Sequence, residues 1–262
     1  SMLLNSPAAK DFSCPHTVEL MTAGAPPPVS VLQGIEKLGF NVTQVYGLTE
    51  TYGHTVMCTW NSDWDNLDEE ARAKLKARQG AAMVQTAGMR IVDMKSREDV
   101  PTDGQTIGEI LIRGNTVMKG YLKDVENTAV SLKNGWFHTG DLAVMHPQGY
   151  AEIKDRLKDI IISGGENISS VEIESVLHRH DAVALAAVVA LPDDKWGEVP
   201  LAFLELLEGA QVTEKEIEVF CRTHLAGFKR PKKVIFGELP KTATGKIQKY
   251  KLRALARSGQ LD

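Results

Sequence analysis

Residues 150–173 constrain the fold of this chain more than any other stretch, because they place charged, apolar and glycine segments in immediate succession. Residues 155–159 contain four charged side chains, Asp155, Arg156, Lys158 and Asp159, and the isoleucines of residues 160–162 follow directly. A short β-branched run of this kind is typical of a buried strand. Gly164 and Gly165 then supply the conformational freedom that a tight turn requires. We interpret this stretch as a segment that joins two bodies of the chain.

A helix is predicted directly after this turn. Ser169 followed by Glu172 is a capping-box pattern, so we expect a helix from about Ser170 through Leu177. Backbone amides beside a glycine pair and a helix start can approach an extended ligand or a phosphate closely. The glycine pair alone is equally typical of a plain turn.

The rest of the chain alternates strand and helix patterns. Strands at residues 18–21 and 41–46, joined by a helix at residues 31–38, predict part of a parallel α/β sheet. The later predicted elements are a polar helix at 67–78, antiparallel strands at 89–93 and 109–113, a short helix at 127–129, strands at 183–191 and 201–206, and a helix at 213–225. Together with the helix from Ser170, the last group predicts a compact α+β domain.

Short motifs accompany these elements in a fixed order. They are VYGLTET (45–51), GEILIRG (108–114), GWFHTGD (135–141), DRLKD with SGGENI (155–168), GFKRPK (227–232) and PKTATGKI (240–247). In this order they resemble the acyl-adenylating superfamily of AMP-binding enzymes, which comprises acyl-CoA synthetases, luciferases and peptide-synthetase adenylation units. Residues 60–64 and 76–80 resemble the short- and medium-chain acyl-CoA ligase branch, close to plant acyl-activating enzymes and methylmercaptopropionate–CoA ligases.

The resemblance implies a mixed α/β and α+β fold. Residues 1–80 would form a partial α/β subdomain of the large adenylating domain, residues 81–156 its β-rich subdomain, and residues 157–262 a small mobile α+β domain. Family members carry a Gly/Ser/Thr-rich phosphate loop upstream of the region seen here. We therefore expect a C-terminal half that is inactive alone, and we interpret Ser1-Met2 as a tag remnant.

For ATP, the resemblance implies an adenine pocket lined by Gly24 and Ala25, with the ring of Tyr46 against the base. A core aromatic at a strand end is the alternative for Tyr46. Asp141, expected at the start of a strand, would accept hydrogen bonds from both ribose hydroxyls. Arg156 would reach the ribose or the phosphate, because its planar fork suits such oxygens.

Thr49 and Glu50 follow the second predicted strand. A hydroxyl can donate to a phosphate oxygen, and a carboxylate can hold magnesium, which usually keeps waters and nucleotide phosphates as its other ligands. We predict both residues as catalytic and Glu50 as the magnesium ligand. An ordinary helix N-terminus is the alternative.

Lys246 is the predicted catalytic cation. Gly245 would let its loop approach a ligand, and the ammonium group would pair with the carboxylate and the α-phosphate as charge develops. An exposed lysine in a basic tail is the alternative. The last 35 residues are rich in Lys and Arg and should attract polyanions, but they lack the interleaved aromatics of a nucleic-acid module.

The resemblance also implies a coenzyme A path in the small domain. The residues that would line it are Gly164, Gly165, Trp196, Phe228, Arg230 and Lys232. A carboxylate would first attack the α-phosphate of ATP, and the thiol of coenzyme A would then displace AMP from the acyl-adenylate. Because Lys246 and the Gly164-Gly165 turn should lie on different faces, we expect the domain to rotate about Lys158 between the steps.

Composition excludes other classes of protein. The chain has 262 residues, 43% hydrophobic residues and a net charge of −4, which are ordinary values for a soluble domain. No apolar run approaches the roughly 20 residues that cross a bilayer, and the cysteines are scattered. We predict a cytoplasmic enzyme that acts on a small carboxylate with ATP, magnesium and coenzyme A, without a membrane or nucleic-acid partner. A homodimer is compatible with the sequence.

Two alternatives stay open. A peptide-synthetase-type unit would load a carrier protein, although the chain ends soon after Lys246 without a carrier domain. The chain alone could also be a non-catalytic body that binds nucleotide or coenzyme A.

Overall fold

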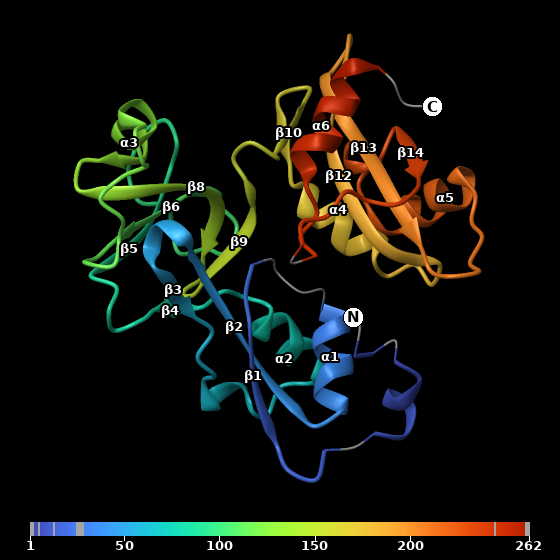
Figure 1. Cartoon of the computed structure of the whole chain (residues 1–262), viewed down its shortest axis with the longest axis horizontal. Coiled ribbons are helices and arrows are strands. Elements are labelled where there is room, and N and C mark those ends of the chain that lie inside the picture. Colours follow the sequence, from blue (N-terminus) through green and yellow to red (C-terminus); the bar gives the residue numbers. More distant parts are fainter. Residues whose placement is uncertain (1–2, 5, 13, 25–28, 244, 260–262) are drawn as a thin grey trace. The chain divides into compact units, whose positions relative to one another are not determined.

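The computed structural model describes residues 3–4, 6–12, 14–24, 29–243 and 245–259. The chain divides into two compact units, Ser1–Ile153 (unit 1) and Lys154–Asp262 (unit 2). Figure 1 shows the elements of both units, coloured from blue to red along the chain. The division falls just before the predicted boundary at residues 156/157.

The first sheet of unit 1 has the strand order β1-β2-β3-β4. Its elements are β1 (Val18–Thr22), α1 (Val29–Lys37), β2 (Phe40–Leu48), β3 (Gly53–Met57) and β4 (Ala81–Ala82), preceded by η1 (Pro7–Asp11). β1 and β2 are parallel, as the strand–helix–strand pattern predicts. Leu32 and Ile35 of α1 pack with Val42 of β2 in a small core. The expected partial parallel sheet is therefore confirmed.

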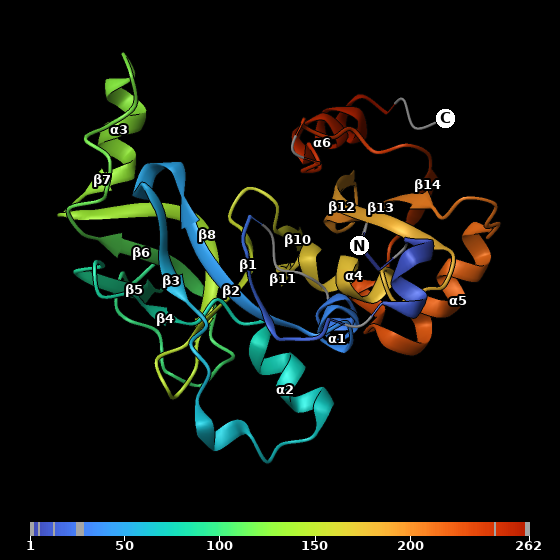
Figure 2. The same cartoon turned by 60° about the horizontal axis from the view of Figure 1, so that its bottom comes forward.

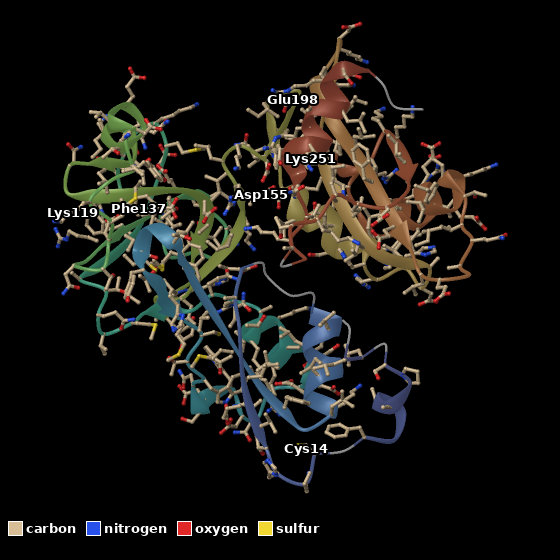
Figure 3. The ribbon with its side chains drawn as sticks, in the orientation of Figure 1. Cys14, Lys119, Phe137, Asp155, Glu198 and Lys251 are labelled. Carbon is tan, nitrogen blue, oxygen red and sulfur yellow. The ribbon has the colours of Figure 1, made fainter. Side chains whose placement is uncertain are left out.

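The second sheet of unit 1 has the order β5-β6-β8-β7, with β9 beside β8. Its strands are β5 (Gly88–Val92), β6 (Gly108–Arg113), β7 (Leu132–Lys133), β8 (Trp136–Met145) and β9 (Ala151–Arg156). β5 and β6 are antiparallel, as predicted, and β8 pairs with β6 in the same way. Phe137 of β8 is buried, 2% exposed (Figure 3), and Val56 of β3 shares a core with Ile110 and Ile112 of β6. This core packs β3 of the first sheet with the second sheet.

Short helices connect these strands. They are η2 (Thr49–Thr51), η3 (Ser62–Trp64), α2 (Glu69–Lys76) and α3 (Val125–Ser131). α2 is the predicted polar helix, and the Asp68 side chain caps it by accepting a hydrogen bond from the Ala71 amide. Its acidic residues lie in the first turn and its basic residues in the last, the order that suits the helix dipole.

Unit 2 is one mixed sheet covered by helices on both faces. Its strands are β10 (Ile161–Ser163), β11 (Glu166–Ile168), β12 (Val183–Asp193), β13 (Gly197–Leu206) and β14 (Lys233–Phe236). Its helices are α4 (Ser170–Leu177), α5 (Glu214–His224), η4 (Gly227–Lys229) and α6 (Lys249–Ser258). Figure 2 shows α6 on one side of the sheet and α4 and α5 on the other.

Strand alternation explains these three layers. Val188 of β12 and Leu204 of β13 belong to the core beneath α4 and α5. Their neighbours along the strands, Val189 and Phe203, belong to the core beneath α6. A strand whose two faces are both apolar is buried on both sides, so these strands require helices on each face.

The helix after the glycine turn begins and ends where the sequence predicts. The Ser169 hydroxyl accepts a hydrogen bond from the Glu172 amide (3.1 Å), as in a capping box. In the described part of the chain, however, the Glu172 carboxylate contacts Lys229 Nζ at 2.7 and 2.8 Å. The reciprocal half of the predicted box at this helix is therefore wrong, whereas the box between Thr213 and Glu216 at α5 is complete.

The sequence analysis did not identify β14 or α6. It treated the end of the chain as a basic patch, but several of its cations are held in ion pairs within unit 2. These are Lys229 with Glu172, Lys241 with Glu205, Lys249 with Glu174 and Arg253 with Asp159. The patch is therefore partly neutralised by the fold.

Candidate active site

In unit 1 the structure brings together Tyr46 and Asp141, the predicted adenine and ribose ligands. The Tyr46 hydroxyl at the end of β2 donates to Asp141 Oδ2 on β8 at 2.8 Å. Asp141 is only 4% exposed, and its amide donates to Thr139 Oγ1 at 3.1 Å. The Tyr46 ring packs against the core that contains Val56. Tyr46 thus has the core contact of the alternative interpretation while its hydroxyl reaches the predicted ribose ligand.

Asp141 does not begin a strand, as the sequence analysis expected, but lies inside β8. Gly140, which precedes it, has a φ of +69°, a conformation that favours glycine. The register between β6 and β8 shifts at this point, between Glu109 and Leu111. A bulge inside a strand re-aims the side chain beside it. The predicted strand start at Asp141 was wrong, because β8 continues through Gly140 as a bulged strand.

Glu109 supports this bulge and was not identified from the sequence. It is 6% exposed, and its Oε1 accepts a hydrogen bond from the Gly140 amide at 3.2 Å. Its Oε2 lies 3.0 Å from Nδ1 of His138 and 3.4 Å from Nη1 of Arg97. A buried carboxylate needs such partners, so Glu109 fixes the backbone directly before Asp141. The partners lie far from Glu109 in sequence, so no local pattern indicates this role.

Thr49 and Glu50 form η2 directly after β2, and Thr49 is exposed. Oε1 of Glu50 accepts a hydrogen bond from the Tyr121 hydroxyl at 2.9 Å, and its carbonyl accepts from the Met118 amide at 2.8 Å. Burial raises the pKa of Tyr121, and the contact with Glu50 acts in the same direction. Glu50 is therefore oriented by the loop before α3.

Magnesium would fit Glu50 as a single protein ligand. Among the residues with described positions, no group of three or more His, Cys, Asp or Glu is placed to hold a metal ion. Magnesium typically takes one or two carboxylates and keeps waters and substrate phosphates as its other ligands. A single carboxylate, next to Thr49 in the sequence, agrees with this coordination preference of magnesium.

The two predicted adenine-pocket residues follow β1 in the chain. Gly24 follows β1, is exposed, and has a φ of +92° with open space where a Cβ would stand. Ala25 lies outside the described residues. Their role stays a prediction.

In unit 2 the structure brings Gly164 and Trp196 together. Gly164 and Gly165 turn the chain between β10 and β11 with φ angles of +58° and +88°. The Gly164 amide donates to the Trp196 carbonyl at 2.8 Å, and a Cβ on Gly164 would lie 2.8 Å from the indole ring. The indole is nevertheless 45% exposed. A flat aromatic face beside a bare backbone turn is suited to an extended ligand.

The other predicted coenzyme ligands follow α5. Phe228 in η4 is 48% exposed, and Lys229 Nζ lies 5.7 Å from its ring centroid. Nε of Arg230 donates to the Leu225 carbonyl at 3.1 Å, which orients the guanidinium. Lys232 is exposed, and its amide donates to the Pro200 carbonyl at 2.8 Å.

Lys246 is exposed on a closed loop between β14 and α6. The loop is closed by a bridge between Lys241 and Ile247. Its interior bonds run from the Thr242 amide to the Lys246 carbonyl (2.8 Å) and from the Lys246 amide to Thr242 Oγ1 (3.1 Å). The backbone at Lys246 is thus fixed by hydrogen bonds within the loop, and the residue as a whole is exposed.

Arg156 and Lys158 lie where the chain enters unit 2. The Arg156 amide donates to Asp155 Oδ1 at 2.7 Å, and Arg156 is partly exposed. Lys158 is exposed in the turn after β9, where the amides of Asp159 and Ile160 bond to the Arg156 carbonyl at 2.9 and 3.0 Å. The predicted hinge therefore lies in a hydrogen-bonded turn, and its role as a pivot stays a prediction.

Comparison with known proteins tests the resemblance. Residues 1–122 match the family described as AMP-binding enzyme, and residues 172–246 match the AMP-binding enzyme C-terminal domain. The chain belongs to the AMP-binding enzyme family. The superfamily predicted from the motifs is confirmed.

Two curated plant proteins illustrate the similarity. The chain is 53% identical over 248 residues to an acetate–CoA ligase of Humulus lupulus, covering 93% of this chain and 44% of that protein. It is 52% identical over 248 residues to a peroxisomal acetate/butyrate–CoA ligase of Arabidopsis thaliana, with coverage of 93% and 44%. The chain spans about half the length of the curated relatives that it matches.

A solved structure supports the fold. The o-succinylbenzoate–CoA synthetase of Bacillus subtilis in complex with its acyl-adenylate intermediate matches with a TM-score of 0.81 at 33% identity, covering 96% of this chain and 49% of that chain. The predicted fold class is confirmed. Among the described residues, no helix is long and apolar enough to cross a membrane.

Proposed function

We propose that this chain is the C-terminal half of an AMP-forming acyl-CoA ligase that activates a short- or medium-chain carboxylate. The observation that carries the proposal is the 2.8 Å contact between Tyr46 and Asp141, which joins the predicted adenine and ribose ligands at one point of unit 1. Plant relatives named as ligases of acetate and butyrate support the substrate class.

In the first half-reaction, Asp141 accepts hydrogen bonds from the ribose hydroxyls and Tyr46 lies against the adenine. Thr49 donates to a phosphate oxygen, and Glu50 holds magnesium, which supplies neutralisation of the phosphate charge. Lys246 pairs with the carboxylate and the α-phosphate as the bond between them forms. The products are an acyl-adenylate and pyrophosphate.

In the second half-reaction, the thiol of coenzyme A attacks the acyl carbon and AMP leaves. Phe228, Arg230 and Lys232 hold the coenzyme nucleotide, and Gly164, Gly165 and Trp196 guide the pantetheine arm. Arg156 binds the ribose or the phosphate of the adenylate. A rotation about Lys158 exchanges Lys246 for the glycine turn between the steps.

Three further predictions belong to this proposal. The location is predicted to be cytoplasmic, although one relative is peroxisomal by name. The acyl group could be transferred to a carrier protein instead of coenzyme A. A homodimer is compatible with the sequence, and a measurement of the protein's molecular mass in solution tests it.

The experiment is a panel of carboxylates tested on the full-length protein that carries this chain, with pyrophosphate release as the first readout and AMP release as the second. We expect carboxylate-dependent pyrophosphate release, followed by AMP release that requires coenzyme A. Release of AMP that requires a carrier protein would favour the alternative acceptor. Absence of pyrophosphate release with every carboxylate would contradict the proposal.

A further inference from the structure

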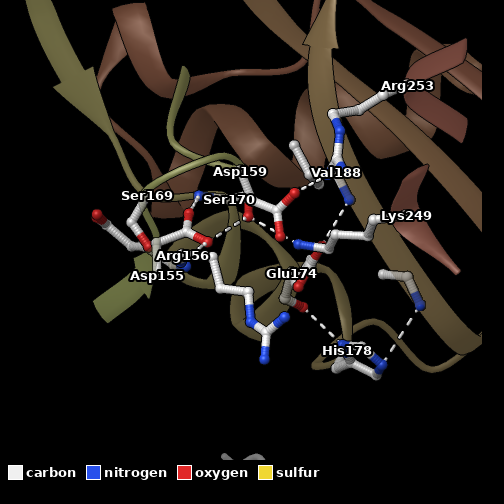
Figure 4. A network of polar contacts seen from close by, with 12 residues as sticks. Asp155, Arg156, Asp159, Ser169, Ser170, Glu174, His178, Val188, Lys249 and Arg253 are labelled. Carbon is white, nitrogen blue, oxygen red and sulfur yellow. Dashed lines mark hydrogen bonds and ion pairs between the residues drawn. The ribbon is translucent and has the colours of Figure 1, made fainter. Parts of the chain in front are cut away.

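A largely buried ion pair joins α6 to α4 three residues after Lys246. Lys249, in the first turn of α6, places Nζ 2.6 Å from Glu174 Oε1 on α4, and their side chains are 17% and 15% exposed. The same carboxylate oxygen accepts a hydrogen bond from the Val188 amide of β12 at 2.7 Å. Figure 4 shows Glu174 between Lys249 and the strand. Burial raises the pKa of Glu174, and the Lys249 ammonium opposes that shift.

From this pair, a chain of hydrogen bonds leads to the segment that enters unit 2. Lys249 Nζ also donates to Ser170 Oγ at 2.7 Å. The Ser170 hydroxyl donates to Asp155 Oδ1 at 3.1 Å, and the Ser170 amide donates to Asp155 Oδ2 at 2.5 Å. Asp155 in turn accepts from the Arg156 amide at 2.7 Å. The network thus connects the start of α6 with the backbone of a predicted adenylate ligand.

A second contact links α6 to the same segment one helical turn later. Arg253 pairs with Asp159, and these side chains are 17% and 9% exposed. Residues four apart lie on one face of a helix, so Lys249 and Arg253 point the same way. Asp159 follows Lys158 directly. Residues 155 and 159, on either side of the predicted hinge, are therefore both held by unit 2.

An adjoining stripe of α6 is fixed by apolar packing. Leu252 and Ala256 are buried against Val189 and Phe203 of the sheet. That packing would hold α6 without any charge. Buried ion pairs add little net stability because desolvation offsets their attraction. The Lys249–Glu174 and Arg253–Asp159 pairs connect α6, which follows the Lys246 loop, with residues 155–159. We therefore interpret them as fixing the positions of these two segments, not as a source of stability.

We propose that Lys249 and Arg253 are positioning residues that tie the Lys246 loop to residues 155–159. The tie holds the catalytic ammonium and the entry segment in one arrangement during the first half-reaction. Its contact with Asp155 lies across the predicted pivot, so this contact opens when the domain rotates for the second half-reaction. This inference rests on the proposed function. It adds two residues, with their partners Glu174 and Asp159, that act on the first half-reaction without contacting substrate.

The test uses the full-length ligase with the paired variant Lys249→Met/Glu174→Gln. Methionine keeps the length of the lysine without its charge, and the glutamine carbonyl can still accept from the Val188 amide. We expect pyrophosphate release to fall roughly 10- to 100-fold in kcat, because a small misplacement of a catalytic group has effects of this size. KM for ATP should change little, and thioester formation from supplied acyl-adenylate and coenzyme A should stay within about twofold.

The controls separate positioning from folding. Lys249→Arg, which keeps the charge, should restore most of the first half-reaction. The exposed pair Arg222–Glu218 on α5 is a matched control, and Arg222→Met/Glu218→Gln should change neither half-reaction. Amide exchange at Lys246 should accelerate in the Lys249→Met/Glu174→Gln protein and not in the α5 control.

Two results would overturn the inference. If the rates of both half-reactions are unchanged in Lys249→Met/Glu174→Gln, the network is dispensable. If both rates fall by the same factor, the network is merely structural. A wild-type protein that releases no pyrophosphate would instead overturn the proposed function on which the inference depends.

Discussion

The two units place their predicted ligand residues in different ways. In unit 1 these side chains hold partners across the unit, as Tyr46 does with Asp141 and Glu50 with Tyr121. In unit 2, Lys246 and Gly164 lie on backbone turns at the surface, above a sheet with a buried charged network. The contrast suggests that unit 1 binds through preformed side chains, whereas unit 2 binds through the shape of its turns. Substitutions in the two units should therefore differ in their effects on ATP use and on coenzyme A use.

The largest effect is expected in unit 1. Asp141→Ala removes the proposed acceptor of both ribose hydroxyls and leaves the Tyr46 hydroxyl without this partner. We expect kcat/KM for ATP in the full-length enzyme to fall roughly 100-fold or more, since losing a buried charged partner costs about 2–5 kcal/mol. Tyr46→Phe removes only the neutral donor and should cost about fivefold. Equal effects of the two substitutions would contradict the assignment of Asp141 as the ribose ligand.

An intermediate effect is expected at the glycine turn of unit 2. Gly164→Ala strains a φ of +58° and pushes a Cβ against the Trp196 ring. We expect the KM for coenzyme A to rise about tenfold, since strain of this kind costs about 1–3 kcal/mol, with pyrophosphate release unchanged. Adding Trp196→Ala to Gly164→Ala should remove the clash, but it also removes the indole proposed to guide the pantetheine arm, so the KM for coenzyme A should stay raised. A loss of pyrophosphate release in Gly164→Ala would show that the turn does not act through its shape in the second step alone.

The smallest effect concerns pH and the outer edge of β12, whose Ala186 and Val188 amides bond to His178 and Glu174. His178 Nδ1 faces the Glu174 carbonyl at 2.7 Å and Nε2 faces the Ala186 amide at 3.3 Å, so the ring is neutral with its proton on Nδ1. Burial lowers the pKa of His178. Its contribution to stability is therefore present above the unfolded pKa, about 6.5, and is lost as the pH falls through the lowered folded value. Burial raises the pKa of Glu174, so its contribution to the pH dependence has the opposite sign.

Comparison with His178→Gln isolates this contribution. The free energy of opening at the Ala186 and Val188 amides, measured by hydrogen exchange, should fall by about 1 kcal/mol more in the wild type than in the variant between pH 7 and 5.5. The same pH dependence in both proteins would contradict a neutral, buried His178.

Local signals predicted much of the fold, and distant partners account for what was missed. Ser169 and Thr213 predicted the starts of α4 and α5, because an N-capping side chain forms its hydrogen bond within the first turn of its own helix. Helix α6 was missed because its cations dominate its composition. The partners of Lys249 and Arg253, Ser170 and Asp159, lie 79 and 94 positions away. Sequence spacing cannot reveal such pairs.

In the candidate site too, local motifs indicated some residues, whereas features that depend on distant partners were missed. Motifs indicated Asp141, Lys246 and Gly164 by their resemblance to a family. They did not reveal the bulge that places Asp141 inside β8, nor Glu109 beneath it, because both depend on the register between two strands.

The most direct test of the account compares both half-reactions of the full-length enzyme in the Lys246→Met variant. We predict that carboxylate-dependent pyrophosphate release falls roughly 100-fold or more, as for loss of a charge-stabilising group. Transfer from supplied acyl-adenylate to coenzyme A should stay within about twofold of the wild type. A variant that loses both half-reactions equally, or neither, would contradict the claim that unit 2 uses different surfaces for the two steps.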